Sequence, residues 1–224
     1  MAANDIYSLP DPGLRADSCL PPILQRRRTS RTFAARPVSR EEVTHLLWAA
    51  QGINAPDGRR TAPSAGALYP LELHLVSGQV DRLPAGIYRY DAVRHALRAE
   101  IMDDMRQAVA QAALDQDWVA QAPAIVVITA VDSRTTEKYG RRGIRYVHME
   151  VGHASQNLLL QAAALGLAAA TVGAFDDERL HRLLRLPEGE RPLVILPVGH
   201  PHQRVRDSRL SAPASPSATA AMRP

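Results

Sequence analysis

Apolar residues recur at two periods along the chain, and the period separates expected helices from expected strands. Spacings of three and four residues predict helices over 21–28, 39–52, 103–114, 144–165 and 176–187. Alternation, or an unbroken β-branched run, predicts strands over 71–76, 86–91, 95–100, 123–132, 168–175 and 192–201. This order of elements indicates an α+β protein in which helices cover a mixed sheet.

Three of these segments carry a more specific signal. The helix over 39–52 opens with Ser39 followed by Glu42, which is the spacing of a capping box. The run over 123–132 is apolar without alternation, so we expect a strand buried on both faces. The pattern over 144–165 keeps its three–four spacing for many turns, so we expect a long helix buried on several sides, partly by another subunit.

Composition divides the chain into one domain with two appended segments. Residues 1–19 predict an irregular N-terminal arm, residues 20–210 form the domain, and residues 211–224 are a low-complexity tail. No apolar run reaches the roughly 18–20 residues that cross a bilayer, and no signal peptide is visible. A single cysteine, Cys19, excludes an intrachain disulfide. We therefore expect a cytoplasmic protein without membrane attachment.

The charge of the chain is mildly basic and is concentrated in arginine clusters. The net charge is +4, the pI is near 9.6, and clusters lie at 26–31 and 141–145. Nucleic-acid binding is not expected, because no aromatic residues are interleaved with these charges and no reading motif is present. A small phosphorylated ligand needs only a few arginines, since each can bind phosphate through two hydrogen bonds.

Several catalytic and cofactor motifs are absent from the sequence. There is no glycine-rich dinucleotide fingerprint after a strand and no Walker loop. The run over 62–66 comes near the nucleophile elbow of serine hydrolases, but it begins with alanine and precedes its strand instead of following one. His148 and His153 would lie about 140° apart around a helix, so they cannot share a metal ion. We expect no metal site.

Four segments in register carry a resemblance to a known family. They are the arginine-rich stretch 27–33, the small-residue loop 63–70, the helix segment 150–166 and the stretch from 171 through the last strand. Together they resemble the FMN-dependent nitroreductase superfamily, and the loop sequence PSAGALYPLEL is similar to its SagB-type branch, which includes azoline-oxidising dehydrogenases. The resemblance covers about 22–210 and implies a mostly antiparallel central sheet, with the long helix at the interface of a homodimer.

The resemblance implies FMN as the cofactor and assigns residues to it. Arginines and a hydroxyl near the N-terminus would hold the phosphate, the small-residue loop and a later glycine would lie against the flavin ring, and an arginine after the last strand would complete the phosphate site. The loop lacks the asparagine of many family members, so either backbone groups replace its contact or that contact is absent. The implied cofactor-binding residues are Arg27, Arg28, Thr29, Arg31, Pro63, Ser64, Ala65, Gly66, Leu68, Val172, Gly173, Ala174 and Arg209.

A Lys–Tyr pair, Lys138 and Tyr139, precedes the long helix. In azoline dehydrogenases a pair at the matching place takes part in removing a proton from the substrate ring carbon, so the resemblance implies that both residues are catalytic. A lysine acts as a base only if its pKa falls below its usual value near 10.4, which burial or a neighbouring cation such as Arg141 can cause. Tyr69, in the loop, is a second candidate for contact with substrate.

The implied function is that of an FMN-dependent oxidoreductase that transfers hydride between a substrate and flavin N5. Oxidation of an azoline or a similar C–N bond in natural-product biosynthesis is the expected reaction. Two alternatives stay open: an NAD(P)H-dependent nitroreductase or quinone reductase, and a non-catalytic flavin-binding subunit of a biosynthetic complex. The expected partners are a second copy of the chain and a small-molecule or peptide substrate.

Overall fold

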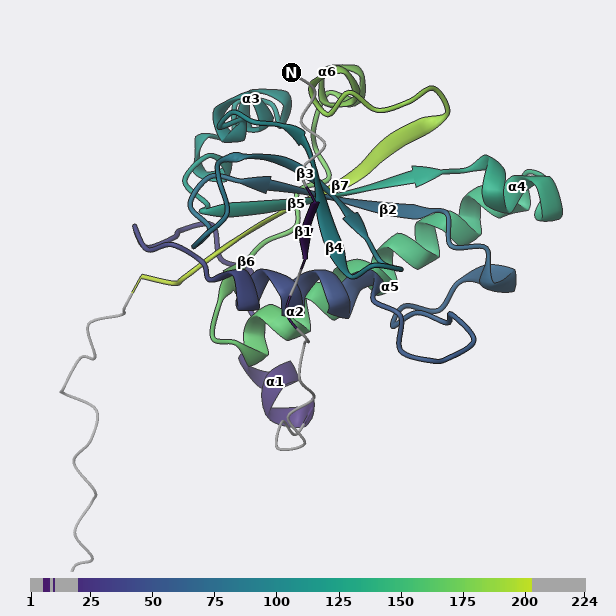
Figure 1. The fold of residues 1–224 in the computed structure, drawn as a ribbon, viewed down its shortest axis with the longest axis horizontal. Helices are drawn as coiled ribbons and strands as arrows, with labels where there is room; N and C mark the ends of the chain where they lie inside the picture. Colours follow the sequence, from purple (N-terminus) through teal and green to yellow (C-terminus); the bar gives the residue numbers. More distant parts are fainter. Residues whose placement is uncertain (1–5, 9, 11–19, 203–224) are drawn as a thin grey trace, which may run out of the picture.

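A seven-stranded sheet forms the centre of the molecule (Figure 1). The computed structural model describes residues 6–8, 10 and 20–202, so Arg209 and the expected tail 211–224 lie outside the described residues. The strand order is β1-β4-β3-β2-β5-β7-β6, and each neighbouring pair is antiparallel. The strands are β1 (Ile6–Ser8), β2 (Leu71–Ser77), β3 (Gly86–Asp91), β4 (Ala96–Ile101), β5 (Ala124–Val131), β6 (Ala168–Ala169) and β7 (Glu190–Gly199).

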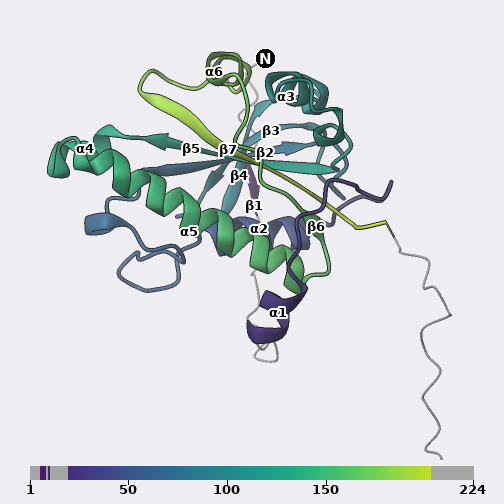
Figure 2. The same cartoon turned by 180° about the vertical axis from the view of Figure 1, so that it is seen from behind.

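Helices flank the sheet, with α2 and α5 on one face and α3 and α6 on the other (Figures 1 and 2). The α+β architecture and the mostly antiparallel sheet expected from the sequence are confirmed. No helix in the described part of the chain is long and apolar enough to cross a membrane. The helices are α1 (Leu20–Arg26), α2 (Arg40–Gln51), α3 (Arg106–Ala112), α4 (Ser133–Tyr139), α5 (Arg142–Ala164) and α6 (Asp177–Leu183), with 3-10 turns η1 (Ala65–Ala67) and η2 (Asp117–Val119).

The structure differs from the sequence-based expectations at three places. The arm expected to be irregular contains β1, because its backbone pairs with β4 and Tyr7 packs edge-on against Tyr88 with ring centroids 5.5 Å apart. The strand expected over 168–175 is limited to β6, since an alanine-rich run has little β propensity. Helix α4 was not predicted, because its polar sequence has no apolar period and buries only Thr135.

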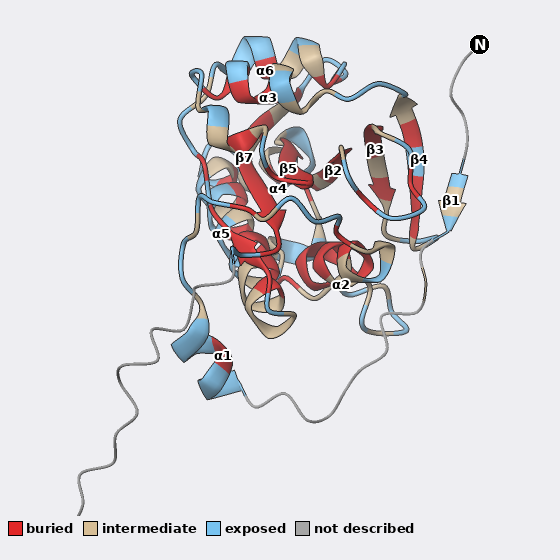
Figure 3. Ribbon diagram, turned by 90° about the vertical axis from the view of Figure 1, so that its left-hand side faces the viewer, coloured by how far each residue is buried: buried red, intermediate tan, exposed pale blue. Residues whose placement is uncertain are grey.

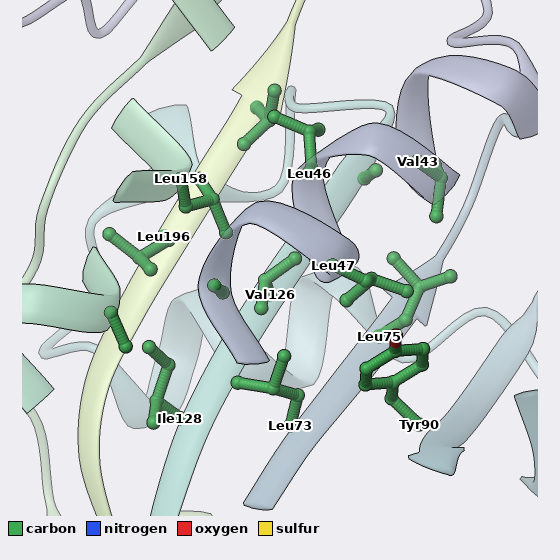
Figure 4. Close-up of a cluster of buried hydrophobic side chains, with 14 of the residues drawn as sticks. Val43, Leu46, Leu47, Leu73, Leu75, Tyr90, Val126, Ile128, Leu158 and Leu196 are labelled. Atoms are coloured by element: carbon green, nitrogen blue, oxygen red, sulfur yellow. The ribbon is translucent and has the colours of Figure 1, made fainter. Parts of the chain in front are cut away.

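The main core lies between the sheet and the α2–α5 layer (Figure 3). Helix α2 begins with the expected capping box: the Ser39 backbone N–H donates to Glu42 Oε2 at 2.8 Å, and the Glu42 N–H donates to Ser39 Oγ at 3.0 Å. The cap fixes the start of α2 and therefore its apolar face. Figure 4 shows that face on the sheet, where Val43, Leu46 and Leu47 of α2 meet Leu73 and Leu75 of β2, Val126 and Ile128 of β5, Leu158 of α5 and Leu196 of β7.

Strand β5 is buried on both faces, as its unbroken apolar run predicts. Its alternate residues belong to two different clusters. Val126 and Ile128 pack under α2 and α5, whereas Ile125 and Val127 pack with α3 and α6. The strand is central because it pairs with β2 on one side and β7 on the other.

A buried ionic cluster lies on the sheet face opposite α2 and α5. His74 Nε2 is 3.0 Å from Glu190 Oε1, and Arg89 Nη2 donates to Glu190 Oε2 at 2.9 Å. The Thr129 hydroxyl also donates to Glu190, and Glu100 Oε2 lies 3.4 Å from His74 Nδ1. Burial alone would raise the pKa of Glu190, but His74, Thr129 and Arg89 outweigh it and lower the pKa to about 2. The cluster therefore joins strands β2, β3, β4, β5 and β7 through a charged centre.

Candidate active site

The loop before β2 and the helix after β5 are brought together by strand pairing. Leu71, at the start of β2, pairs with Ala130, near the end of β5. The start of one strand and the end of its antiparallel neighbour lie at the same edge of the sheet. The segments attached to these two ends therefore lie side by side. The small-residue loop over 60–70 therefore meets α4.

Lys138 and Tyr139 reach the loop at Gly66. A Cβ atom on Gly66 would lie 2.8 Å from Tyr139 Oη and 3.1 Å from Lys138 Nζ. Gly66 has a positive φ of 65°, in the left-handed region, and nothing larger than hydrogen fits between it and the pair. The predicted catalytic pair and the predicted cofactor loop thus form one cluster.

The Lys–Tyr pair is held by its own packing. Lys138 Nζ lies 5.4 Å from the centroid of the Tyr139 ring, and that ring packs edge-on against Tyr146 of α5 with centroids 5.1 Å apart. Helices α4 and α5 pack closely, because a Cβ on Gly143 would lie 2.9 Å from Thr136 Cα. The pair therefore lies where α4 and α5 pack closely against each other.

One signal for this site could have been found in the sequence. The chain has 27 basic residues of the lysine and arginine type, and Lys138 is the single lysine among them. Arginine is always protonated in proteins, whereas lysine can lose its proton. The chain uses arginine at every other such position, so this cluster holds its one lysine amine.

We expect Gly66→Ala to be more damaging than Gly58→Ala. Both glycines have positive φ, 65° and 82°, but a Cβ on Gly58 would meet none of the described residues within 4 Å. The control variant therefore isolates the conformational cost, about 1–2 kcal/mol. Gly66→Ala adds a displacement of Lys138, which is visible as a shifted Lys138 signal in NMR of the reductively 13C-methylated protein. Equal unfolding free energies and an unmoved signal would contradict the close approach.

The arginine-rich segment lines a groove at the other end of α5. The groove has a volume of about 240 Å³ and includes Arg27 and Arg28. Arg28 Nη1 donates to Gln25 O and to Arg27 O, both at 2.8 Å, and so caps the end of α1. The remaining lining residues are Arg26, Ser30, Leu159, Ala163, Gly166, Leu167, Ala168, Ala169 and Pro201.

Two residues assigned to the phosphate lie outside this groove. Thr29 forms a parallel bridge with Ala169 and has an exposed side chain. The Arg31 guanidinium lies 5.7 Å from the centroid of the Trp118 ring. Its cation–π contact holds the side chain against η2 instead of in the groove. Ser30, which the sequence reasoning did not assign, contributes a hydroxyl there.

The segment Val172–Ala174 follows the edge of β7. Val172 is buried and exchanges two backbone hydrogen bonds with Ile195, 2.8 and 3.0 Å long. Gly173 and Ala174 are exposed, and a Cβ on Gly173 would meet no described atom within 4 Å. Among the described residues, therefore, no contact requires a glycine at position 173. Arg209 lies outside the described residues.

The donor set fits the phosphate and ring of FMN, but in two separate places. Arg27, Arg28 and Ser30 supply two guanidinium groups and a hydroxyl for a phosphate, while the loop around Gly66 offers backbone groups to the ring, next to Lys138 and Tyr139. Helix α5 separates the two places and its 23 residues span roughly 34 Å. Figures 1 and 2 show α4 at one end of α5 and α1 near the other. Tyr146, which packs against Tyr139, and Leu159, which lines the groove, are 13 residues apart in α5, or roughly 20 Å along the helix, so one chain does not bring the two places together.

Metal chemistry has no matching cluster here. Among the described residues, no group of three or more His, Cys, Asp and Glu side chains is placed to hold a metal ion. His148 Nε2 instead lies 3.1 Å from Arg191 Nη2.

Comparisons with known proteins show the family of this chain. The chain matches the Nitroreductase family over residues 24–200. It is 41% identical over 177 residues to MJ1384 of Methanocaldococcus jannaschii, a protein named as a nitroreductase, and the match covers 79% of this chain and 88% of that protein. A crystal structure of a nitroreductase from Ralstonia eutropha has a TM-score of 0.76 and 29% identity, covering 87% of this chain and 89% of that chain.

A further relative is named for the processing of a microcin. The microcin B17-processing protein McbC of Escherichia coli is 27% identical over 143 residues, which cover 61% of this chain and 53% of McbC. The chain thus spans about half the length of this relative. With the family match over most of its length, the chain belongs to the nitroreductase family of oxidoreductases, on its SagB-type branch.

Proposed function

We propose that the protein is an FMN-dependent dehydrogenase that oxidises an azoline ring or a similar C–N bond in a peptide or small molecule. The meeting of Lys138 Nζ and Tyr139 Oη with Gly66 carries this proposal. A base and a hydroxyl beside the loop that the family resemblance assigns to the flavin are the parts that such an oxidation needs. The relationship to McbC supports a substrate from peptide processing.

The residues divide the reaction between them. Bound FMN would supply the two-electron acceptor for the hydride that leaves a substrate carbon, and molecular oxygen would then restore it. The Lys138 amine accepts the proton lost from the neighbouring ring carbon. Tyr139 lies within reach of the same position and can donate a hydrogen bond to the substrate or pass the proton on. The edge-on contact with Tyr146 keeps the Tyr139 ring in place.

We further propose that each site is completed by two chains of a homodimer. In one chain the arginine groove and the Lys–Tyr cluster lie at opposite ends of α5. A two-fold pairing along α5 would place the groove of one protomer beside the loop of its partner. The exposed apolar side chains near this helix support the pairing: Leu20 is 53% exposed, Leu24 49% and Met149 53%.

Purified protein should release FMN on denaturation, and anaerobic addition of a thiazoline-containing model peptide should bleach the flavin bands. This experiment separates the proposed reaction from its alternatives. Bleaching by NAD(P)H alone would favour the nitroreductase reaction, and a bound flavin that no donor reduces would favour a binding subunit. A protein that neither contains nor takes up FMN would contradict the proposal.

Subunit complementation tests the shared site. We expect an Arg27→Ala/Arg28→Ala variant and a Lys138→Ala variant each to be inactive alone. In a mixed dimer one site receives both mutations and the other is intact, so random mixing should restore about a quarter of the wild-type rate. The mixture would stay inactive if each chain built its own site, because every site would then carry one mutation.

A further inference from the structure

A second buried polar cluster lies between α2, α5 and the small-residue loop. The Glu150 side chain of α5 belongs to a residue that is 2% exposed, and Gln51 at the end of α2 is 1% exposed. Within the described part of the chain, Glu150 Oε1 and Gln51 Nε2 have no hydrogen-bond partner. Buried polar groups without partners are costly and need an explanation. The proposed reaction, as described above, uses neither group.

The cluster is connected to both ends of the loop. Gln51 Oε1 accepts a hydrogen bond from Arg60 Nη1 at 2.9 Å. Arg60 in turn stacks over the Tyr69 ring at 4.7 Å, and its backbone N–H donates to Tyr69 Oη at 3.2 Å. The Tyr69 N–H donates to Ser64 Oγ at 2.9 Å, and Ser64 faces Glu150. These contacts join the two ends of the loop, and Ser64 of the loop lies next to the Glu150 carboxyl group.

One face of α5 supports both parts of the candidate active site. Tyr146 and Glu150 are four residues apart in the helix, so their side chains lie on the same face. Tyr146 packs against Tyr139, and Glu150 lies against Ser64. The Lys–Tyr pair and the loop meet at Gly66. Tyr146 supports the pair, and Glu150 supports the loop.

The carboxyl group changes its charge near neutral pH. Burial raises the pKa of Glu150 to about 7, although Ser64, Arg60 and Gln51 act in the opposite direction. The contact with Gln51 is weaker than an ordinary hydrogen bond, because the amide nitrogen lacks a partner of normal geometry. The ionisable groups around the cluster are Arg60 and Tyr69 in the loop, Glu72 on β2, Lys138 and Tyr139 on α4, and His153 on α5.

We propose that Glu150 is a positioning residue, which fixes the loop against Lys138 and Tyr139 through Ser64 and the Gln51–Arg60 pair. Its meaning for catalysis rests on the function proposed above. The raised pKa means that the buried arrangement favours the protonated carboxyl group, because burying a carboxylate costs more than burying the neutral acid. The loop is therefore held more tightly below pH 7 than above it.

Hydrogen exchange of the full chain without added FMN tests this proposal. Amides over 60–70 should lose about tenfold protection between pH 5.5 and 8.5, after correction for intrinsic exchange rates, because the raised pKa favours the protonated carboxyl group under the closed loop. Glu150→Gln should remove this loss. Glu188→Gln, an exposed glutamate elsewhere in the chain, should leave it unchanged.

A loss that persists in Glu150→Gln, or no loss in the wild-type protein, would overturn the proposal. If Glu150→Gln fails to fold by circular dichroism, Ser64→Ala decides, because Ser64 favours the ionised carboxylate and its removal should enlarge the loss. An unchanged loss in Ser64→Ala would then count against it. The exchange measurement needs no flavin, so a failure of FMN binding and a failure of this proposal are seen separately.

Discussion

Replacing Lys138 with arginine should lower the rate of anaerobic flavin reduction by a thiazoline-containing model peptide by roughly 10²–10⁴-fold, the usual contribution of a general base. The variant keeps a positive charge beside Gly66 but cannot accept a proton, because guanidinium stays protonated. FMN content and unfolding free energy should stay near wild type, since the Lys138 side chain is exposed. Stopped-flow absorbance measures the rate directly.

A rescue experiment provides the control for this result. Lys138→Ala leaves space for a small amine, so added methylamine or ethylamine should restore part of the rate, and Lys138→Arg should not respond. The rate should also depend on the basicity of the added amine. A Lys138→Arg protein that reduces its flavin at the wild-type rate would show that the amine is no base.

Glu190→Gln should lower the free energy of unfolding by about 3–5 kcal/mol, the cost of removing one partner from a buried ion pair. His74 and Arg89 would keep their charges without the carboxylate that faces both of them. Glu188→Gln is the matched control, because Glu188 is exposed two residues away and should change stability by less than about 0.5 kcal/mol. Unfolding in guanidinium chloride at pH 6 measures the free energy of unfolding of both variants.

The charged cluster around Glu190 also predicts how the stability difference between the wild-type protein and Glu190→Gln depends on pH. The pKa of Glu190 is lowered to about 2, so its contribution is complete above its unfolded value and is lost as the pH falls through about 2. Burial would lower the pKa of His74, but Glu100 and Glu190 outweigh it and raise the pKa. Its contribution is complete below roughly pH 6.5 and is lost as the pH rises through the folded value. A difference that does not vary between pH 2 and 9 would contradict the charged cluster.

The elements that the sequence predicts well are those whose signal is local. Helix α2 has its cap within four residues, and α5 repeats one apolar spacing over its whole length. The short strand β1 and the polar helix α4 have no such period, and tertiary contacts decide them. Pairing with β4 makes Ile6–Ser8 a strand, and packing of Thr136 under Gly143 supports α4.

The candidate site was predictable in its parts but not in its assembly. The residue types of the loop and of the Lys–Tyr pair indicated cofactor and base chemistry. Their contact at Gly66 depends on the pairing of Leu71 with Ala130, which no local pattern specifies. The position of Arg31 was equally hidden, since its contact with Trp118 joins residues distant in sequence. The buried cluster around Glu190 joins residues of five strands, and no short sequence pattern predicts it.

Helix α5 also limits how the length of this chain can change during evolution. Inserting one residue in the helix would turn everything beyond it by about 100° and move it by about 1.5 Å. The arginine groove would then face a different direction from the corner that carries Lys138 and Tyr139. Seven added residues would restore the direction but lengthen the helix by about 10 Å. The helix therefore fixes both the distance and the relative orientation of the two places. It tolerates substitutions along its exposed face but not insertions or deletions.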